Sequence, residues 1–175
     1  MAEQRNWRRM LGRMLRHRWL DDKDAAKLMP PELMERLARR VAASERRHGG
    51  EIRICVEAGL PLGYLWREAT ARERALAMFG KLRVWDTEAN NGVLIYLLLA
   101  ERAIEIVADR GLNRYVSQEA WREIVARMSL AFREARFEDG LTQALEEVSA
   151  LLVQHFPLAE NQPDRNELPD EPALQ

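Results

Sequence analysis

The stretch Asn90–Leu112 constrains the fold of this chain more than any other part of the sequence. It reads NNGVLIYLLLAERAIEIVADRGL, in which a turn is followed by the apolar run Val93–Leu99 and then by the alternating run Ile104–Ala108. A run without a polar face is typical of a central strand covered on both sides, whereas alternation is typical of a strand with one covered face. Residues 100–102 between them are few enough for a hairpin. The sequence therefore predicts two paired strands at the centre of a sheet.

Helical patterns and one further strand surround this hairpin. The alternating segment Glu51–Glu57 follows a glycine pair and predicts a strand. A proline at the first helical position, a Thr-x-x-Glu capping box and an N-terminal serine cap are start signals for helices. The expected helix starts are Pro31, Thr70, Ser117 and, from apolar spacing alone, Glu138. Residues 59–68 have no clear period, and we expect a loop there.

Composition indicates one folded domain with two extensions of opposite charge. The 175 residues are 47% hydrophobic, which is enough for a core. We expect a basic amphipathic extension over residues 1–29, an α/β domain over residues 30–156 and an acidic disordered tail over residues 157–175. The tail combines prolines with scattered acids, a composition that disfavours a packed core.

The N-terminal extension has an amphipathic pattern. Apolar residues recur at helical spacing from Trp7 to Leu15, and six arginines but only one acid, Glu3, lie between Met1 and Arg18. One interpretation is that residues 5–19 anchor the chain on an anionic membrane surface or bind an unidentified protein partner. The other is that the apolar stripe packs on the domain and the arginines are solvated. The net charge of −1 and the absence of an aromatic stacking platform give no reason to expect nucleic-acid binding.

Sequence motifs for compartment and catalysis are sparse. Cys55 is the only cysteine, so the chain has no intramolecular disulfide. No apolar run approaches the ~20 residues of a membrane span, and no secretory signal pattern is present, so we expect a cytoplasmic protein, with peripheral membrane attachment left open. The familiar phosphate-loop, nucleophile-elbow and zinc-protease motifs are missing from the sequence.

The acidic loop before the central strand is the candidate ligand site. Oxygen ligands of the kind that Ca²⁺ and Mg²⁺ prefer come from Asp86, Glu88, Asn90 and Asp109, with Asn91 beside them. Because a hairpin returns to the edge from which it starts, residues 86–91 and Asp109 are expected at one edge of the sheet. The alternative is an ordinary turn made by Asx residues and Gly92.

The order of these segments resembles the TPM domain family. The matching pieces are Gly50–Glu57, Gly92–Leu97, Ile104–Leu112, Phe137 and Gly140-Leu141, within a region from about Pro31 to Phe156. The resemblance implies an α/β/α sandwich with a small mixed central sheet flanked by helices. It also implies divalent-metal binding and acid phosphatase activity in some members, with Asp86 in the loop where such a site would be sought.

Two functions remain open from the sequence. The first is a non-catalytic accessory or interaction module of TPM type that docks on a membrane surface or a membrane-protein complex, since a complete fold is present without a complete catalytic set. The second is a divalent-metal-dependent, acid phosphatase-like hydrolase, in which the metal would polarise the phosphoryl oxygens and activate water.

Overall fold

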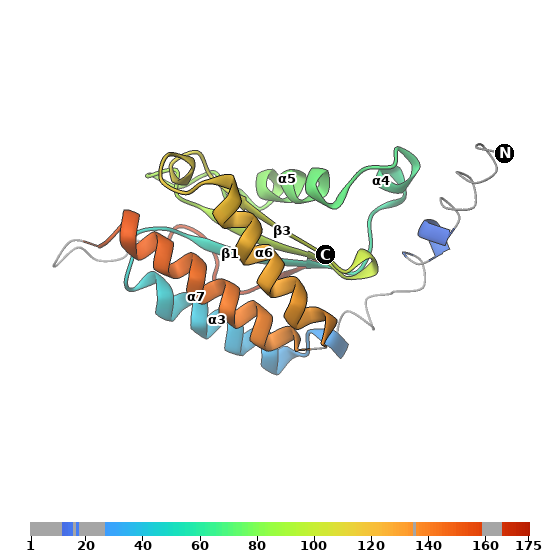
Figure 1. Cartoon of the computed structure of the whole chain (residues 1–175), viewed down its shortest axis with the longest axis horizontal. Helices are drawn as coiled ribbons and strands as arrows, with labels where there is room; N and C mark the ends of the chain where they lie inside the picture. Colours follow the sequence, from blue (N-terminus) through green and yellow to red (C-terminus); the bar gives the residue numbers. More distant parts are fainter. Residues whose placement is uncertain (1–11, 16, 18–26, 135, 159–165) are drawn as a thin grey trace.

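A four-stranded open mixed sheet forms the middle layer of the protein (Figure 1). The computed structural model describes residues 12–15, 17, 27–134, 136–158 and 166–175, so the predictions for residues 1–11, 16, 18–26 and 159–165 lie outside the described residues. The strands are in the order β3-β2-β1-β4, with β1 parallel to both β2 and β4 and β2 antiparallel to β3. Their bounds are Ile52–Glu57 for β1, Val93–Leu98 for β2, Ala103–Ala108 for β3 and Ala173–Leu174 for β4.

The predicted central hairpin is confirmed. Every residue of β2 is buried, and the strand pairs with β3 from Val93 opposite Ala108 to Leu98 opposite Ala103. The chain turns from β2 to β3 through the short 3₁₀ helix η1 (Leu99–Glu101), which is followed by Arg102 in the left-handed conformation, with φ 51°. The apolar run is therefore central because β1 covers one of its edges, β3 covers the other, and helices cover both faces.

Three helices cover one face of the sheet (Figure 1), where they enclose the larger apolar cluster. Ile52, Ile54 and Val56 of β1 point into this cluster. Ser117 caps the helix that begins at Gln118, as predicted, since its side chain accepts a hydrogen bond from the Ala120 amide. The helices are α3 (Pro31–Glu45), α6 (Gln118–Arg133) and α7 (Phe137–His155).

The opposite face is covered by α5 (Ala71–Lys81), which packs on β2 and β3 (Figure 1). The predicted capping box is present, because the Thr70 side chain accepts from the Glu73 amide and the Glu73 carboxylate accepts from the Thr70 amide. The expected loop before it contains the short helix α4 (Leu62–Trp66). Five residues are too few to produce a helical period in the sequence. The layers thus form the α/β/α arrangement that the family resemblance implies.

Residues 166–175 differ from the predicted disordered tail. They lie along β1, where β4 pairs with Cys55 and Val56 and where Leu168 is 7% exposed. The Glu51 carboxylate accepts hydrogen bonds from the amides of Glu167 and Leu168. A composition rich in proline and acids does not reveal that the outer edge of β1 offers partners for this backbone.

None of the helices in the described part of the chain is long and apolar enough to cross a lipid bilayer.

Candidate functional site

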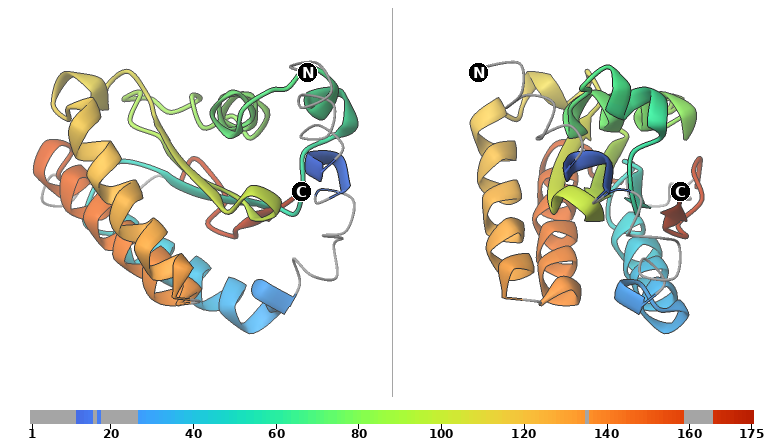
Figure 2. Two further views of the ribbon diagram at one scale, coloured as in Figure 1. Left: turned by 45° about the vertical axis from the view of Figure 1, so that its right-hand side comes forward. Right: turned by 90° about the vertical axis from the view of Figure 1, so that its right-hand side faces the viewer.

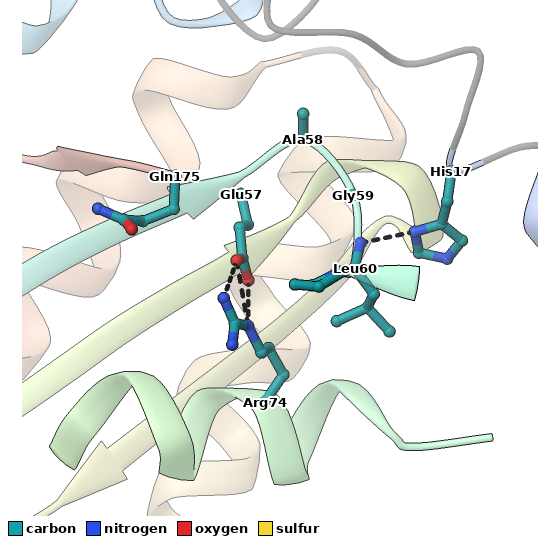
Figure 3. A pocket seen from close by; sticks show the side chains of 8 residues that line it. His17, Glu57, Ala58, Gly59, Leu60, Arg74 and Gln175 are labelled. Carbon is teal, nitrogen blue, oxygen red and sulfur yellow. Dashed lines mark hydrogen bonds and ion pairs between the residues drawn. The ribbon is translucent and has the colours of Figure 1, made fainter. Parts of the chain in front are cut away.

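The carboxyl end of β1, which is parallel to β2 and β4, opens onto a cavity of about 350 Å³ (Figure 3). In open α/β sheets, ligands bind preferentially outside the carboxyl ends of the strands. The polar side chains that line this cavity are His17, Glu57, Arg74 and Gln175, and the segment from Ala58 to Pro61 closes one side.

Glu57, the last residue of β1, is the centre of a buried polar cluster. Arg74 Nε donates to both carboxylate oxygens, at 3.1 and 2.9 Å, and its Nη2 donates to Oε1 (Figure 3). The Tyr96 hydroxyl donates to Oε2 at 2.6 Å. Burial, followed by the bond to Glu57, raises the pKa of Tyr96, and the bond to Glu57 raises the pKa of Arg74. These donors join β1 to α5 and β2.

A second polar cluster joins the described part of the N-terminal extension to the same end of the sheet. The Leu60 amide donates to His17 Nδ1 at 2.9 Å, so Nδ1 carries no proton and Nε2 is the nitrogen that donates to Glu101, also at 2.9 Å. Arg13 Nε donates to the same carboxylate oxygen at 2.6 Å, and its Nη2 donates to the Ala69 carbonyl. Burial alone would raise the pKa of Glu101, but the bonds from Arg13 and His17 lower it.

These contacts give the acid–base side chains of the cavity a structural role. The Glu57 carboxylate already accepts from two side chains, and both ring nitrogens of His17 have partners. Cys55 is buried on the same face, and burial raises the pKa of its thiol to about 12, which leaves it unreactive near neutral pH. The arrangement holds the N-terminal segment, α4 and α5 against the sheet.

An apolar surface lies beside this cavity. Leu62 and Trp66 are one helical turn apart on α4, and each is 72% exposed, while Leu15 on the N-terminal segment is 54% exposed. Residues 12–15 lie beside α4 (Figure 2), and a groove of about 430 Å³ runs between the two segments. We call Leu15, Leu62 and Trp66 the apolar face. The groove is lined by Met14, Leu15, His17, Leu60, Pro61, Leu62 and Leu65.

The metal ligands predicted from the sequence lie at the opposite end of the sheet, and each already has a protein contact. Asp86 forms an ion pair with Arg83, and the Glu88 amide donates to the Glu167 carboxylate at 3.0 Å. Arg110 Nε donates to Asn90 Oδ1 at 2.8 Å, and the Arg110 amide donates to Asp109 Oδ1 at 2.6 Å.

The hairpin does bring Asn90 and the residues after β3 to one edge, as expected, since the Gly111 amide donates to the Asn90 carbonyl at 2.9 Å. Asp109 Oδ2 is buried without a partner among the described residues. A single such oxygen is not a cation cage, and no group of three His, Cys, Asp or Glu side chains in the described part of the chain is placed to hold a metal. The Arg110 guanidinium on Asn90 occupies one of the predicted ligands, whereas Ca²⁺ and Mg²⁺ need several converging oxygens, and the metal site stays a prediction.

We expect titration with Ca²⁺ or Mg²⁺ to leave the NMR amide signals of Trp85–Gly92 without a saturable shift. The reason is that a cation at Asn90 would have to displace the Arg110 guanidinium from Oδ1. Saturable shifts confined to these amides, and abolished by Asp86→Ala with Glu88→Ala, would instead establish the metal site predicted from the sequence.

Sequence reasoning missed the cluster at the carboxyl end of β1. One signal was present: Arg53, Cys55 and Glu57 alternate on the second face of a predicted strand. Charges on a covered strand face require partners. The sequence could not identify those partners, because Tyr96 and Arg74 are far from Glu57 along the chain and only the fold brings them together.

The chain matches the family described as the TPM domain over residues 23–151. The structure is similar to that of the BA42 protein from the psychrophilic bacterium Bizionia argentinensis, with 26% identity, a TM-score of 0.71, and coverage of 82% of this chain and 93% of the other. It also shares its fold with the N-terminal domain of a protein from P. gingivalis, with 22% identity, a TM-score of 0.58, and coverage of 77% and 84%. No curated protein matches the chain.

Proposed function

The chain belongs to the TPM domain family, and we propose that it is a non-catalytic accessory module that docks on an anionic membrane surface through the apolar face. The observation that carries this proposal is the pair of large side chains on α4, Leu62 and Trp66, each 72% exposed, of which Leu62 lines one groove with Leu15. Exposed leucine and tryptophan on one helical face favour insertion into the headgroup region of a bilayer, where tryptophan is enriched.

The charge of the N-terminal segment supports an anionic surface as the partner. Arg13 lies next to the groove, where Glu101 and the Ala69 carbonyl hold it in place. The sequence places five further arginines between Met1 and Arg18. Each basic residue near an anionic bilayer contributes about 1 kcal/mol of attraction. In this proposal the basic segment and the apolar face act on the same membrane surface.

The contacts at the carboxyl end of β1 support an accessory role. Glu57 and His17 are residue types that serve as general acids and bases, but each is hydrogen-bonded to protein groups that would have to leave first. The same cluster fixes Arg13 against Glu101 and His17 against Leu60 and Glu101, and so places Leu15 beside α4. In this proposal the polar cluster positions the docking surface.

Co-sedimentation with vesicles of phosphatidylglycerol and phosphatidylcholine tests the proposal. Leu62→Asp with Trp66→Asp should reduce the partition of the full chain by more than about tenfold, because each apolar side chain contributes roughly 1.5–3 kcal/mol on burial. Leu130→Asp is the matched control, since Leu130 is 56% exposed on α6 and lies outside the apolar face.

Equal sedimentation with anionic and neutral vesicles, or a double variant that partitions like the unchanged chain, would refute docking through this face. Binding to a membrane-protein complex but not to vesicles would replace the lipid surface by a protein partner.

The hydrolase function that the sequence leaves open depends on a metal at residues 86–91. Its test is the turnover of a generic phosphomonoester by the full chain with Ca²⁺ or Mg²⁺ present. Turnover that disappears in Asp86→Ala with Glu88→Ala would favour the hydrolase, and turnover that is unchanged would assign the activity to a contaminant.

A further inference from the structure

The outer edge of β1 is covered by a short piece of chain that pairs with only part of it. β2 pairs with β1 along all of Ile52–Glu57, whereas β4 pairs only with Cys55 and Val56. The rest of the tail segment, which we define as residues 166–175, runs along the same edge from Glu51 toward Val56. A partly paired strand edge is a template for the addition of another strand.

Most of the hydrogen bonds between β1 and the tail segment involve the backbone of the tail. Glu51 accepts from two successive tail amides, at 3.1 and 3.2 Å, and Arg53 Nη1 donates to the Pro169 carbonyl. The amide of Gln175 donates to the Val56 carbonyl at 3.0 Å. Backbone pairing with pockets for single side chains is how sheet edges bind extended peptides. Here the side chain that enters the apolar cluster is Leu168.

Arg53 is incompletely satisfied beneath the tail segment. Arg53 is 9% exposed. Among the described residues, its Nε has no hydrogen-bond partner and its guanidinium forms no ion pair. Burial lowers the pKa of this arginine, opposed in part by Cys55 and by acids that include Asp170 and Glu171. A buried guanidinium without a carboxylate partner is costly, so the tail segment is a suboptimal ligand for this edge.

We infer that the outer edge of β1 is a peptide-binding groove in which the tail segment is the resident ligand. The occupant that displaces it is an extended acidic peptide of a partner protein, with a leucine for the Leu168 pocket and a carboxylate for Arg53. The peptide adds to β1 as a parallel strand in place of β4. Its carboxylate supplies the ion pair that the tail segment does not.

The test uses the full chain with Leu168→Asp, which weakens the resident tail and leaves the groove unchanged. The probe is a fluorescent peptide with the sequence of residues 166–175, followed by fluorescence polarisation. We expect it to bind Leu168→Asp at least about tenfold more tightly than the unchanged chain, because a tethered competitor acts at an effective concentration in the millimolar range. Leu174→Asp, at a tail position that is 46% exposed, is the matched control and should behave like the unchanged chain.

Cys55 reports whether the peptide occupies the groove. It is fully buried and lies opposite Ala173 of β4, and it is the only cysteine of the chain. Its reaction with a thiol reagent should accelerate at least about tenfold in Leu168→Asp and slow again when the peptide is added. Circular dichroism checks that the variant is folded, and Leu168→Ala is the milder replacement if it is not.

The role of Arg53 is tested by adding a carboxylate to the peptide where the tail segment has none. Glu in place of Pro169, the residue whose carbonyl accepts from Arg53, should strengthen binding to Leu168→Asp by about threefold to fivefold, and this gain should vanish when Arg53→Met is added. A folded Leu168→Asp chain with accelerated Cys55 labelling and no gain in peptide binding would overturn the inference. So would unchanged Cys55 labelling, or a dimer formed by exchange of tails, which would make a second copy the occupant. Failure of vesicle docking through the apolar face leaves this inference intact.

Discussion

Replacing Arg74 by methionine should lower the free energy of unfolding by about 3–5 kcal/mol, which is the usual cost of removing one partner of a buried ion pair. The Glu57 side chain is 3% exposed and the Arg74 side chain 12% exposed. Without the guanidinium, the Tyr96 hydroxyl is the one side-chain donor to this carboxylate that remains within the described part of the chain. The measurement is urea-induced unfolding at neutral pH, followed by circular dichroism.

The matched control for this prediction is Arg122→Met. Arg122 also pairs with a glutamate, Glu119, but both side chains are about 70% exposed, at 74% and 69%. Exposed pairs contribute little, so stability should hardly change. Adding Glu57→Gln to Arg74→Met should recover part of the loss, because the buried charge is then gone. A loss below about 1 kcal/mol in Arg74→Met would show that the cluster does not hold this end of the sheet together.

Gly92→Ala should destabilise the protein by about 2–3 kcal/mol, at the upper end of the cost of overpacking. A Cβ at this position would collide with the Val84 carbonyl oxygen and lie 3.0 Å from Val84 Cγ1. Since the obstacle includes backbone, the start of β2 would have to shift. Thermal unfolding measures the loss.

Gly80→Ala is the control, for which we expect a change in stability of the opposite sign. Gly80 lies within α5, and apart from its chain neighbours and the nearby backbone of its own helix no atom of the described residues lies within 4 Å of the Cβ that alanine would add. Alanine in a helix is favoured over glycine by about 0.5–1 kcal/mol, so this variant should be more stable than the unchanged chain. Equal effects of Gly92→Ala and Gly80→Ala would contradict the packing described at Val84.

The elements that the sequence predicted are those whose signals are local. The run Val93–Leu99 is apolar on both faces, and the caps at Thr70 and Ser117 bond to amides three residues away. Each of these signals depends on neighbours within one or two turns, so a single sequence contains it. The family resemblance supplied the layer order, which the strand pairing and the two apolar clusters confirm.

The elements that the sequence did not predict depend on partners far along the chain. Glu57 meets Tyr96 across 39 residues, and Arg13 meets Glu101 across 88. The tail segment is ordered on the edge of β1 by Glu51, which is more than a hundred residues away. No local pattern encodes such contacts. The contact of Arg110 with Asn90 is of the same kind, since no local pattern reveals it, and the metal site at residues 86–91 stays a prediction.

Docking through the apolar face is the central claim, and a fluorophore at position 66 tests it most directly. An environment-sensitive dye is attached to the cysteine of Trp66→Cys in a Cys55→Ala background, with Trp85→Cys as the matched site. Trp85 is also an exposed tryptophan, at 51%, but it lies beyond α5, near the start of β2. We predict a blue shift of the dye at position 66, but not at position 85, when anionic vesicles are added. No shift at position 66, or equal shifts at both positions, would contradict the claim.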